Sequence, residues 1–290
     1  MNAGNPRWMN LPNEYCSDDS KFVILPIPYE KDPTYGEGAA KGPAAIIEAS
    51  QHLEYYDERL DCEPFEKGIV VKEPLQLPDE PEAAMEKIAD AVKNIVKDKE
   101  KFLISLGGDH AITIGTVQGL EEKNEDFSIL ILDAHADMKF SWNNSQLNHA
   151  CVARRLSTKH KVGVIGVRSM DVDEAKEIEQ NKNVRIIKAY DYSEKELDKM
   201  LEFLGKNVYL SIDVDVFDPS IIRNTGTPEP GGLDWETVNG ILGKLFASKQ
   251  VIGADVVEFA PHGEAWNYRA EAYALARLVY RLMALYVRKK

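Results

Sequence analysis

The chain has 290 residues, of which 44% are hydrophobic and 29% are charged. This composition excludes disordered and fibrous proteins, and the length is sufficient to bury a large core. The formal net charge of −13 at pH 7 argues against a nucleic-acid partner and favours cationic substrates, although acidity that serves only solubility explains the charge equally well.

Short apolar runs alternate with amphipathic segments along the chain. Strands are expected at residues 22–27, 102–106, 128–132, 162–167, 184–187, 208–212 and 251–257, with 66–71 as a weaker eighth candidate. Helices are expected to begin near Pro43, Glu80, Thr113, Asp171, Ser193, Asp234 and Glu264. Pro43 suits a first helical turn, because proline presets φ there, and Ser193 and Asp234 suit N-caps.

Strand–helix alternation predicts an α/β fold with a mostly parallel sheet of about eight strands. The strands are apolar on both faces, as expected when helices cover both sides of the sheet. No Pro/Gly/Ser-rich linker divides the chain, so we expect one domain over residues 1–290, with 1–20 as an N-terminal extension. In such sheets the site lies beyond the carboxyl ends of the strands.

Neither a membrane anchor nor a disulfide framework is expected. The N-terminal residues 1–7 precede no apolar run, so no signal peptide is visible. The apolar stretch 272–287 is interrupted by Arg277 and Arg281, which indicates an amphipathic helix rather than a membrane span. The three cysteines are scattered, which makes a disulfide framework unlikely and favours a location in the reducing cytoplasm.

Three of the predicted strands end in residues that commonly bind metals. His110 follows strand 102–106; Asp133, His135 and Asp137 follow strand 128–132; Asp213 and Asp215 follow strand 208–212. Alternate residues of an extended segment point to the same side, so the side chains within each motif are expected to converge. Gly107 and Gly108 allow a sharp turn and a close backbone approach before the histidine.

These six residues supply four carboxylates and two imidazoles, which is more negative charge than one divalent ion needs. Two ions about 3.5–4 Å apart, sharing bridging carboxylates, would balance the charge. An oxygen and nitrogen donor set without thiolates favours Mn²⁺ over a structural zinc.

Each motif alone also has a purely structural explanation, as a turn, a helix cap or a hydrogen-bonded core histidine. The combination favours a metal centre, because buried carboxylates at this density repel one another without cations. A dinucleotide-binding loop at residues 36–42 is less well supported. Its glycines have the spacing Gly-x-Gly-x-x-x-Gly several residues after a strand, so we expect a flexible loop that leads into the Pro43 helix.

With these motifs, the sequence resembles the ureohydrolase family of arginases, agmatinases, guanidinobutyrases and formimidoylglutamases. The resemblance runs from Pro33 to the last helix and rests on the segments 107–110 (Gly-Gly-Asp-His), 133–137 (Asp-Ala-His-Ala-Asp), 211–219, 225–232 and 255–261. It implies an arginase-like three-layer α/β/α fold, two Mn²⁺ per subunit and a homo-oligomer, usually a trimer or hexamer. The segment Pro-Glu-Pro-Gly-Gly at 228–232 is more similar to agmatinases than to arginases.

The resemblance also implies a role for each site residue. One ion would be held by His110, Asp133, Asp137 and Asp213, and the other by Asp133, His135, Asp213 and Asp215. Water between the ions would attack the guanidinium carbon. Asp137 would relay its proton to the leaving amine, while His149 would bind substrate and exchange protons with solvent. Glu258 would bind the guanidinium.

The substrate implied is agmatine, hydrolysed to putrescine and urea in polyamine biosynthesis. Aminopropylagmatine, guanidinobutyrate and arginine remain alternatives for the same chemistry. Lys139 stands where arginases tend to have a substrate-binding asparagine; it either points to solvent or binds a substrate carboxylate. Asn224 replaces a glycine common in the family, with little expected effect.

Two functions of other classes also remain open. A deacetylase of arginase-like fold would use one metal and a histidine pair, whereas His110 with four aspartates favours two metals. A binding protein without turnover would be marked by lost ligands, and all six are present.

Overall fold

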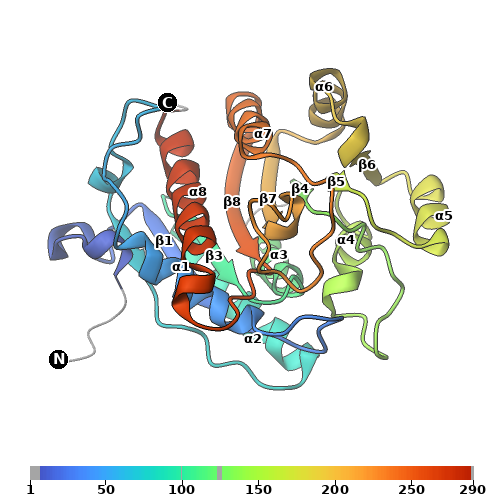
Figure 1. The fold of residues 1–290 in the computed structure, drawn as a ribbon, viewed down its shortest axis with the longest axis horizontal. Coiled ribbons are helices and arrows are strands. Elements are labelled where there is room, and N and C mark those ends of the chain that lie inside the picture. The colour runs from blue at the N-terminus through green and yellow to red at the C-terminus, as the bar shows by residue number, and fades with distance from the viewer. Residues whose placement is uncertain (1–6, 99, 123–125, 289–290) are drawn as a thin grey trace.

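The computed structural model describes residues 7–98, 100–122 and 126–288. Its centre is an eight-stranded sheet in the order β2-β1-β3-β8-β7-β4-β5-β6, in which every neighbouring pair is parallel (Figure 1). The strands are β1 (Phe22–Ile27), β2 (Ile69–Val71), β3 (Phe102–Gly107), β4 (Ser128–Leu132), β5 (Val162–Val167), β6 (Val184–Lys188), β7 (Asn207–Asp213) and β8 (Gln250–Val257).

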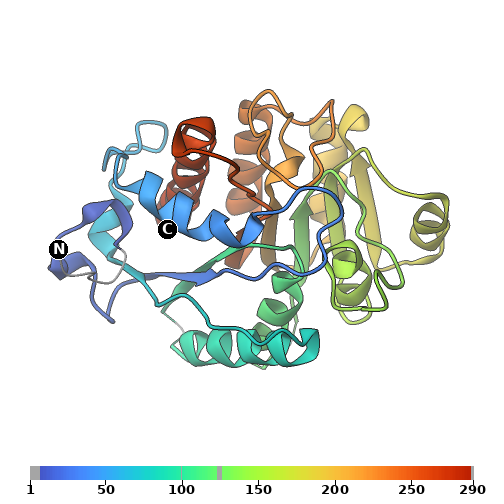
Figure 2. The ribbon, with the colours of Figure 1, turned by 60° about the horizontal axis from the view of Figure 1, so that its bottom comes forward.

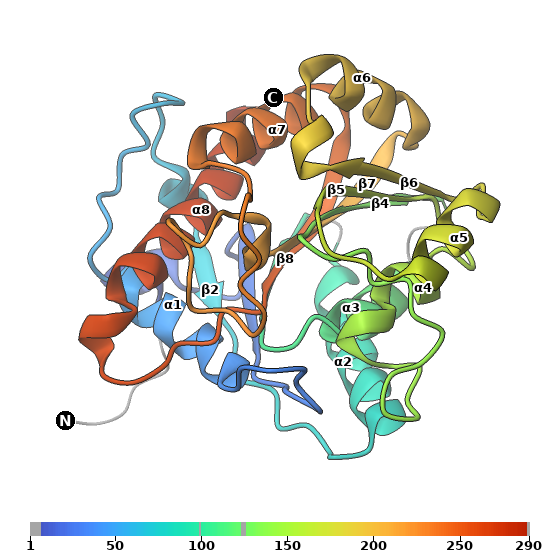
Figure 3. The same ribbon diagram turned by 45° about the vertical axis from the view of Figure 1, so that its right-hand side comes forward.

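Helices cover both faces of the sheet, as Figures 2 and 3 show. They are α1 (Gly42–Ser50), α2 (Pro81–Val96), α3 (Ile112–Glu121), α4 (Val152–Leu156), α5 (Val172–Gln180), α6 (Glu194–Phe203), α7 (Trp235–Ser248) and α8 (Arg269–Arg288). One apolar core joins α1, α6, α7 and α8 to the sheet, and a second joins α2, α3 and α4 to the opposite face. Within β3, Leu103 enters one core and Ile104 the other, which confirms the expected three-layer α/β/α fold.

Most predicted element starts agree with the structure, and the differences have local causes. The candidate strand at 66–71 is shorter, because Pro64–Lys67 form a 3₁₀ turn and Gly68 has a φ of 76°. The last helix begins at Arg269 rather than near Glu264, after a 3₁₀ turn at Ala265–Asn267. The short helix α4 was not predicted.

Side-chain caps fix several helix starts where the sequence indicates them. Asp171 and Glu174 form a reciprocal capping box at the start of α5. The Ser193 hydroxyl accepts a hydrogen bond from the backbone N–H of Glu196, and the Asp234 carboxylate accepts one from Thr237. These bonds satisfy N–H groups that have no partner within the helix.

The strands that carry the predicted site residues lie side by side. Leu106 of β3 pairs with Val256 of β8, which pairs with Ile212 of β7, which in turn pairs with Leu132 of β4. Because these strands are parallel and in register, the segments that follow them emerge at one edge of the sheet.

No helix among the described residues is long and apolar enough to cross a membrane. The predicted apolar C-terminal segment forms most of α8, whose Arg281 makes a buried ion pair with Asp57, with Nε and Oδ2 2.6 Å apart.

Candidate active site

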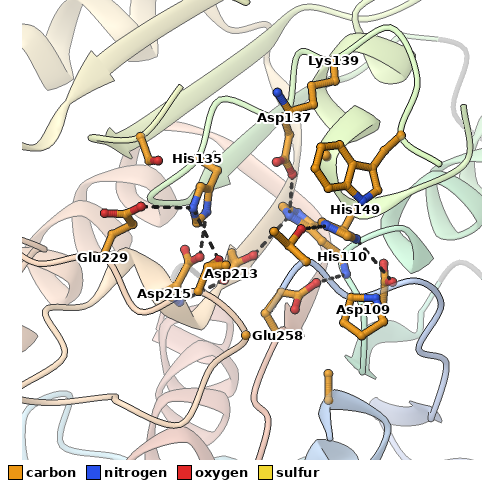
Figure 4. Close-up of a pocket in the computed structure, with 18 of the residues that line it drawn as sticks. Asp109, His110, His135, Asp137, Lys139, His149, Asp213, Asp215, Glu229 and Glu258 are labelled. Carbon is orange, nitrogen blue, oxygen red and sulfur yellow. Dashed lines mark hydrogen bonds and ion pairs between the residues drawn. The ribbon is translucent and has the colours of Figure 1, made fainter. Parts of the chain in front are cut away.

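The six predicted metal ligands converge at the carboxyl edge of the sheet. Figure 4 labels all of them except Asp133. His110 Nδ1 lies 3.2 Å from Asp133 Oδ2, 3.0 Å from Asp137 Oδ2 and 3.3 Å from Asp213 Oδ2. His135 Nδ1 lies 2.9 Å from Asp215 Oδ2 and 3.6 Å from Asp133 Oδ1. Asp133 therefore lies between the two imidazoles.

Two overlapping groups have the geometry of metal-binding triads, with ligand atoms within 4.8 Å of one another. One group is His110, Asp133 and Asp213, and the other is Asp133, His135 and Asp215. The shared Asp133 agrees with its predicted bridging position. The additional assignments of Asp137 to one ion and Asp213 to both stay predictions.

The backbone brings these side chains together by a different route from the one expected. β4 ends at Leu132, and Asp137 turns back toward the cluster with a φ of 50°, not along an extended segment. Asp215 lies in a 3₁₀ turn after β7, where its N–H donates to Asp213 Oδ1. Turns, rather than the alternation of side chains along a strand, therefore orient Asp137 and Asp215 toward the cluster.

Two buried atoms of the cluster indicate what it binds. Within the described chain, His110 Nδ1 and Asp133 Oδ2 make no hydrogen bond of acceptable geometry, although they face each other. Buried polar atoms are normally paired, because leaving one unpaired costs about 1–3 kcal/mol. Lone pairs gathered around one point suit a cation, so these residues fit a metal centre.

The pKa shifts within the cluster also favour a metal centre. Burial and the neighbouring Asp133 raise the pKa of Asp137 to about 6. Burial, Asp215 and Asp133 raise the pKa of Asp213 well above its usual range. Burial lowers the pKa of His135, but Asp215 and Asp133 outweigh burial and raise it to about 12. The buried carboxylates repel one another, and divalent cations bound among them would relieve this repulsion.

Glu258 lies beside the cluster, directly after β8. Its Oε1 accepts a 2.6 Å hydrogen bond from the backbone N–H of His110, and its own N–H donates to the Gly108 carbonyl. Burial and Asp109 raise the pKa of Glu258 to about 8, and a cation bound beside this carboxylate would favour its ionised form.

His149 begins a 3₁₀ turn that Asn148 caps, and both of its ring nitrogens face polar groups. Nε2 lies 2.8 Å from the Thr34 hydroxyl, and Nδ1 lies 3.7 Å from Asp109 Oδ2. Burial lowers the pKa of His149, but Asp109, Glu258 and Asp137 outweigh burial and raise it to about 9. The imidazole can therefore carry a proton in the pocket at neutral pH.

The cluster residues other than Asp133 line one cavity of about 400 Å³. Glu258, His149 and parts of the loop at residues 33–39 line the same cavity. The predicted loop at 36–42 contributes Gly36 and Ala39, and the Glu30 carboxylate accepts hydrogen bonds from two of its N–H groups. The nearby Lys139 does not point freely to solvent. It forms an ion pair with Asp171, lies 3.7 Å from Glu174 Oε2 and approaches the Trp142 ring.

Other pocket residues had no role assigned from sequence. Asp109 supports His149, Thr34 contacts the same imidazole, and Glu229 Oε1 lies 4.0 Å from His135 Nε2. Asp109 and Glu229 belong to the family-like segments, which is a signal that could have found them. Thr34 comes from a distant loop, so no local pattern reveals its contact.

The fold and site together define a parallel α/β protein with a buried, two-histidine, four-aspartate candidate metal centre. The model of the arginase family matches residues 20–285, and this chain belongs to that family. N(1)-aminopropylagmatine ureohydrolase of Thermus thermophilus is 36% identical over 275 residues, covering 92% of this chain and 91% of the relative.

Two further relatives also have ureohydrolase names. Agmatinase of Pyrococcus horikoshii is 36% identical over 253 residues, covering 86% of this chain and 87% of the relative. The crystal structure of agmatine ureohydrolase of Thermoplasma volcanium superimposes with a TM-score of 0.83 at 28% identity, covering 93% of this chain and 91% of that chain.

Proposed function

We propose that residues 1–290 act as a single ureohydrolase domain that hydrolyses a cationic guanidino amine to urea and an amine. The observation that carries the proposal is that Glu258 lines the same cavity as five of the six cluster residues, with Asp133 buried among them. Agmatine, which would yield putrescine for polyamine biosynthesis, is the first candidate substrate. The names of the relatives support the substrate class.

The six cluster residues would hold two Mn²⁺ ions, His110 on one side of Asp133 and His135 on the other. Oxygen and imidazole donors without thiolates suit manganese. When bound, a pair of divalent cations supplies Lewis acidity, which makes water a nucleophile at neutral pH.

The chain supplies the remaining chemistry. Glu258 binds the planar guanidinium through charge-assisted hydrogen bonds and holds its carbon beside the cluster. Asp137 Oδ2 accepts the proton of the attacking water and passes it to the departing nitrogen. The protonated His149 imidazole, held by Asp109 and Thr34, exchanges protons between the pocket and solvent.

Aminopropylagmatine is the second candidate substrate. The Thermus thermophilus relative carries that name, and the acidic cavity, whose Lys139 is already paired with acidic groups, suits a substrate with additional ammonium groups. The same pairing disfavours guanidinobutyrate and arginine, because it leaves Lys139 less able to bind a substrate carboxylate.

A urea-release assay with added Mn²⁺ tests the proposal. Agmatine and aminopropylagmatine are expected to release urea, and the substrate with the higher kcat/KM is the physiological one. Urea from neither compound, with manganese bound, would contradict the proposal. A deacetylase would instead cleave acetylated amines with one metal per chain, and a binding protein would turn over nothing.

A homo-oligomer of three or six chains and a cytoplasmic location complete the proposal. Light scattering on the purified chain distinguishes a trimer from a hexamer, and a monomer would contradict the oligomer.

A further inference from the structure

A buried chain of hydrogen bonds runs from His110 away from the candidate metal centre. The ring nitrogen Nε2 of His110 lies 3.0 Å from the hydroxyl of Ser211 in β7. That hydroxyl lies 2.6 Å from Oδ1 of Asp255 in β8. Ser211 and Asp255 are fully buried, and the mechanism above uses neither of them.

The Asp255 carboxylate is surrounded by hydroxyl groups. Besides Ser211, it receives Tyr209 at 2.6 Å and Thr113 at 3.0 Å, both on Oδ2. Burial raises the pKa of Asp255, and the hydrogen bonds from Ser211, Tyr209 and Thr113 oppose that rise. In its ionised form the carboxylate can only accept, so each hydroxyl donates its one proton to Asp255. The Ser211 oxygen is then left as an acceptor toward His110.

The direction of these bonds fixes the tautomer of His110. Because the Ser211 oxygen accepts, Nε2 of the imidazole must carry the hydrogen. Nδ1 of the neutral ring then keeps its lone pair, and this is the atom that faces Asp133, Asp137 and Asp213. A lone pair at that position is what a metal ligand requires.

We propose that Ser211 and Asp255 are positioning residues that set the tautomer and ring orientation of His110 for cation binding. The inference rests on the proposed metal centre and deepens it. Asp255 acts through Ser211, and neither residue touches the cation or the substrate. The competing explanation is that Asp255 only satisfies three hydroxyls and stabilises the packing of β7 against β8.

Ser211→Ala with a matched control separates these explanations. The substitution removes the hydroxyl oxygen to which His110 Nε2 is hydrogen-bonded. The control, Tyr209→Phe, also removes one buried bond to Asp255 but leaves the Ser211 bridge intact. Each variant loses one buried hydroxyl; Ser211→Ala also loses a 3.3 Å contact with the Thr113 hydroxyl, and only Ser211→Ala loses the link to the imidazole.

The measurement is Mn²⁺ binding to the metal-free chain, followed by the signal of free manganese in electron paramagnetic resonance. Ser211→Ala is expected to weaken one of the two binding steps by about tenfold to a hundredfold, the range for outer partners of metal ligands. Tyr209→Phe is expected to leave both steps within about twofold of the unchanged chain. Equal losses in both variants, or no loss in Ser211→Ala, would overturn the inference.

Asp255→Ala gives a second route if Ser211→Ala fails to fold. It frees the Ser211 hydroxyl to donate to His110, so the same binding step is expected to weaken; unchanged binding would overturn the inference. Suppose the wild-type chain binds two ions and releases urea, and Ser211→Ala and Asp255→Ala bind manganese normally. That result contradicts only this inference. Wild-type chain that binds two ions without releasing urea contradicts only the proposed reaction.

Discussion

Two acidic residues at the centre of the site have backbone conformations that are uncommon for residues other than glycine. Asp137 has a φ of 50° and Glu258 a φ of 66°. Such left-handed conformations cost on the order of 1–3 kcal/mol and persist only where the surrounding structure imposes them. For Glu258, the bonds to Gly108 and His110 impose the conformation and keep the carboxylate beside the cluster.

Glu258→Gln tests the guanidinium anchor directly. The amide keeps the shape of the side chain but removes the charge that binds the cation. We expect kcat/KM to fall by about 3 kcal/mol, or roughly a hundredfold, the loss typical of a hydrogen bond to a charged group. Bound manganese, measured on the same sample, is expected to stay unchanged; its loss would show that Glu258 serves the metal centre instead.

The pH dependence of kcat/KM is expected to be bell-shaped with an alkaline maximum. Glu258 must be ionised to bind the cation, and its pKa of about 8 sets the acid limb. His149 must be protonated to donate, and its pKa of about 9 sets the alkaline limb. Activity therefore rises with pH through the first value and falls through the second.

Asp109→Asn checks the assignment of both limbs. The Asp109 carboxylate raises the pKa of Glu258 and of His149, so removing its charge should move both limbs to lower pH. A pH–rate profile that keeps its limbs in place would show that other groups titrate.

At the scale of elements, the junction between β3 and the segment that carries His110 depends on a close backbone contact. A Cβ atom at Gly108 would lie 2.1 Å from the carbonyl oxygen of Tyr29, and neither Gly107 nor Gly108 has a positive φ. The backbone nevertheless bends at Gly108 and Asp109, as expected, and the expected close backbone approach is also present.

Gly108→Ala is expected to destabilise the chain by about 1–3 kcal/mol, the usual cost of overpacking. Gly240→Ala is the matched control, because Gly240 is exposed in α7 and a Cβ there meets nothing within 4 Å. That substitution should stabilise the chain by about 0.5–1 kcal/mol through helix propensity. Denaturant unfolding measures both; the same sign of change in the two variants would contradict the contact at Tyr29.

Local sequence patterns were sufficient for most of this architecture. Apolar runs predicted the strands, and Ser193 and Asp234 marked helix starts because capping depends on residues within one turn. The length of β2 and the left-handed backbone of Asp137 were not predictable, since they depend on surrounding packing. The contact between Thr34 and His149 joins residues 115 positions apart, and no short-range pattern encodes it.

At the scale of the whole molecule, the concentration of acidic residues at one edge of the sheet makes folding and cation binding interdependent. Four aspartates of the cluster are buried, in a chain with a net charge of −13. A cation that binds only the folded chain stabilises it by about 4 kcal/mol at a thousandfold excess over its Kd.

Removal of metal is therefore expected to lower the Tm, and added Mn²⁺ should restore it. Asp133→Ala, which removes the carboxylate shared by both triads, should abolish this response. Thermal unfolding with and without a chelator measures the effect. If the Tm of the wild-type chain does not change on addition of the chelator, the result argues against a metal centre.

The central claim is that two cations at this cluster support hydrolysis of a guanidino amine. The most direct test is urea release from agmatine and aminopropylagmatine, measured as a function of manganese bound per chain. We predict that activity reaches its plateau only when two ions are bound to each chain. A plateau at one ion per chain, or no urea from either substrate at two, would contradict the claim.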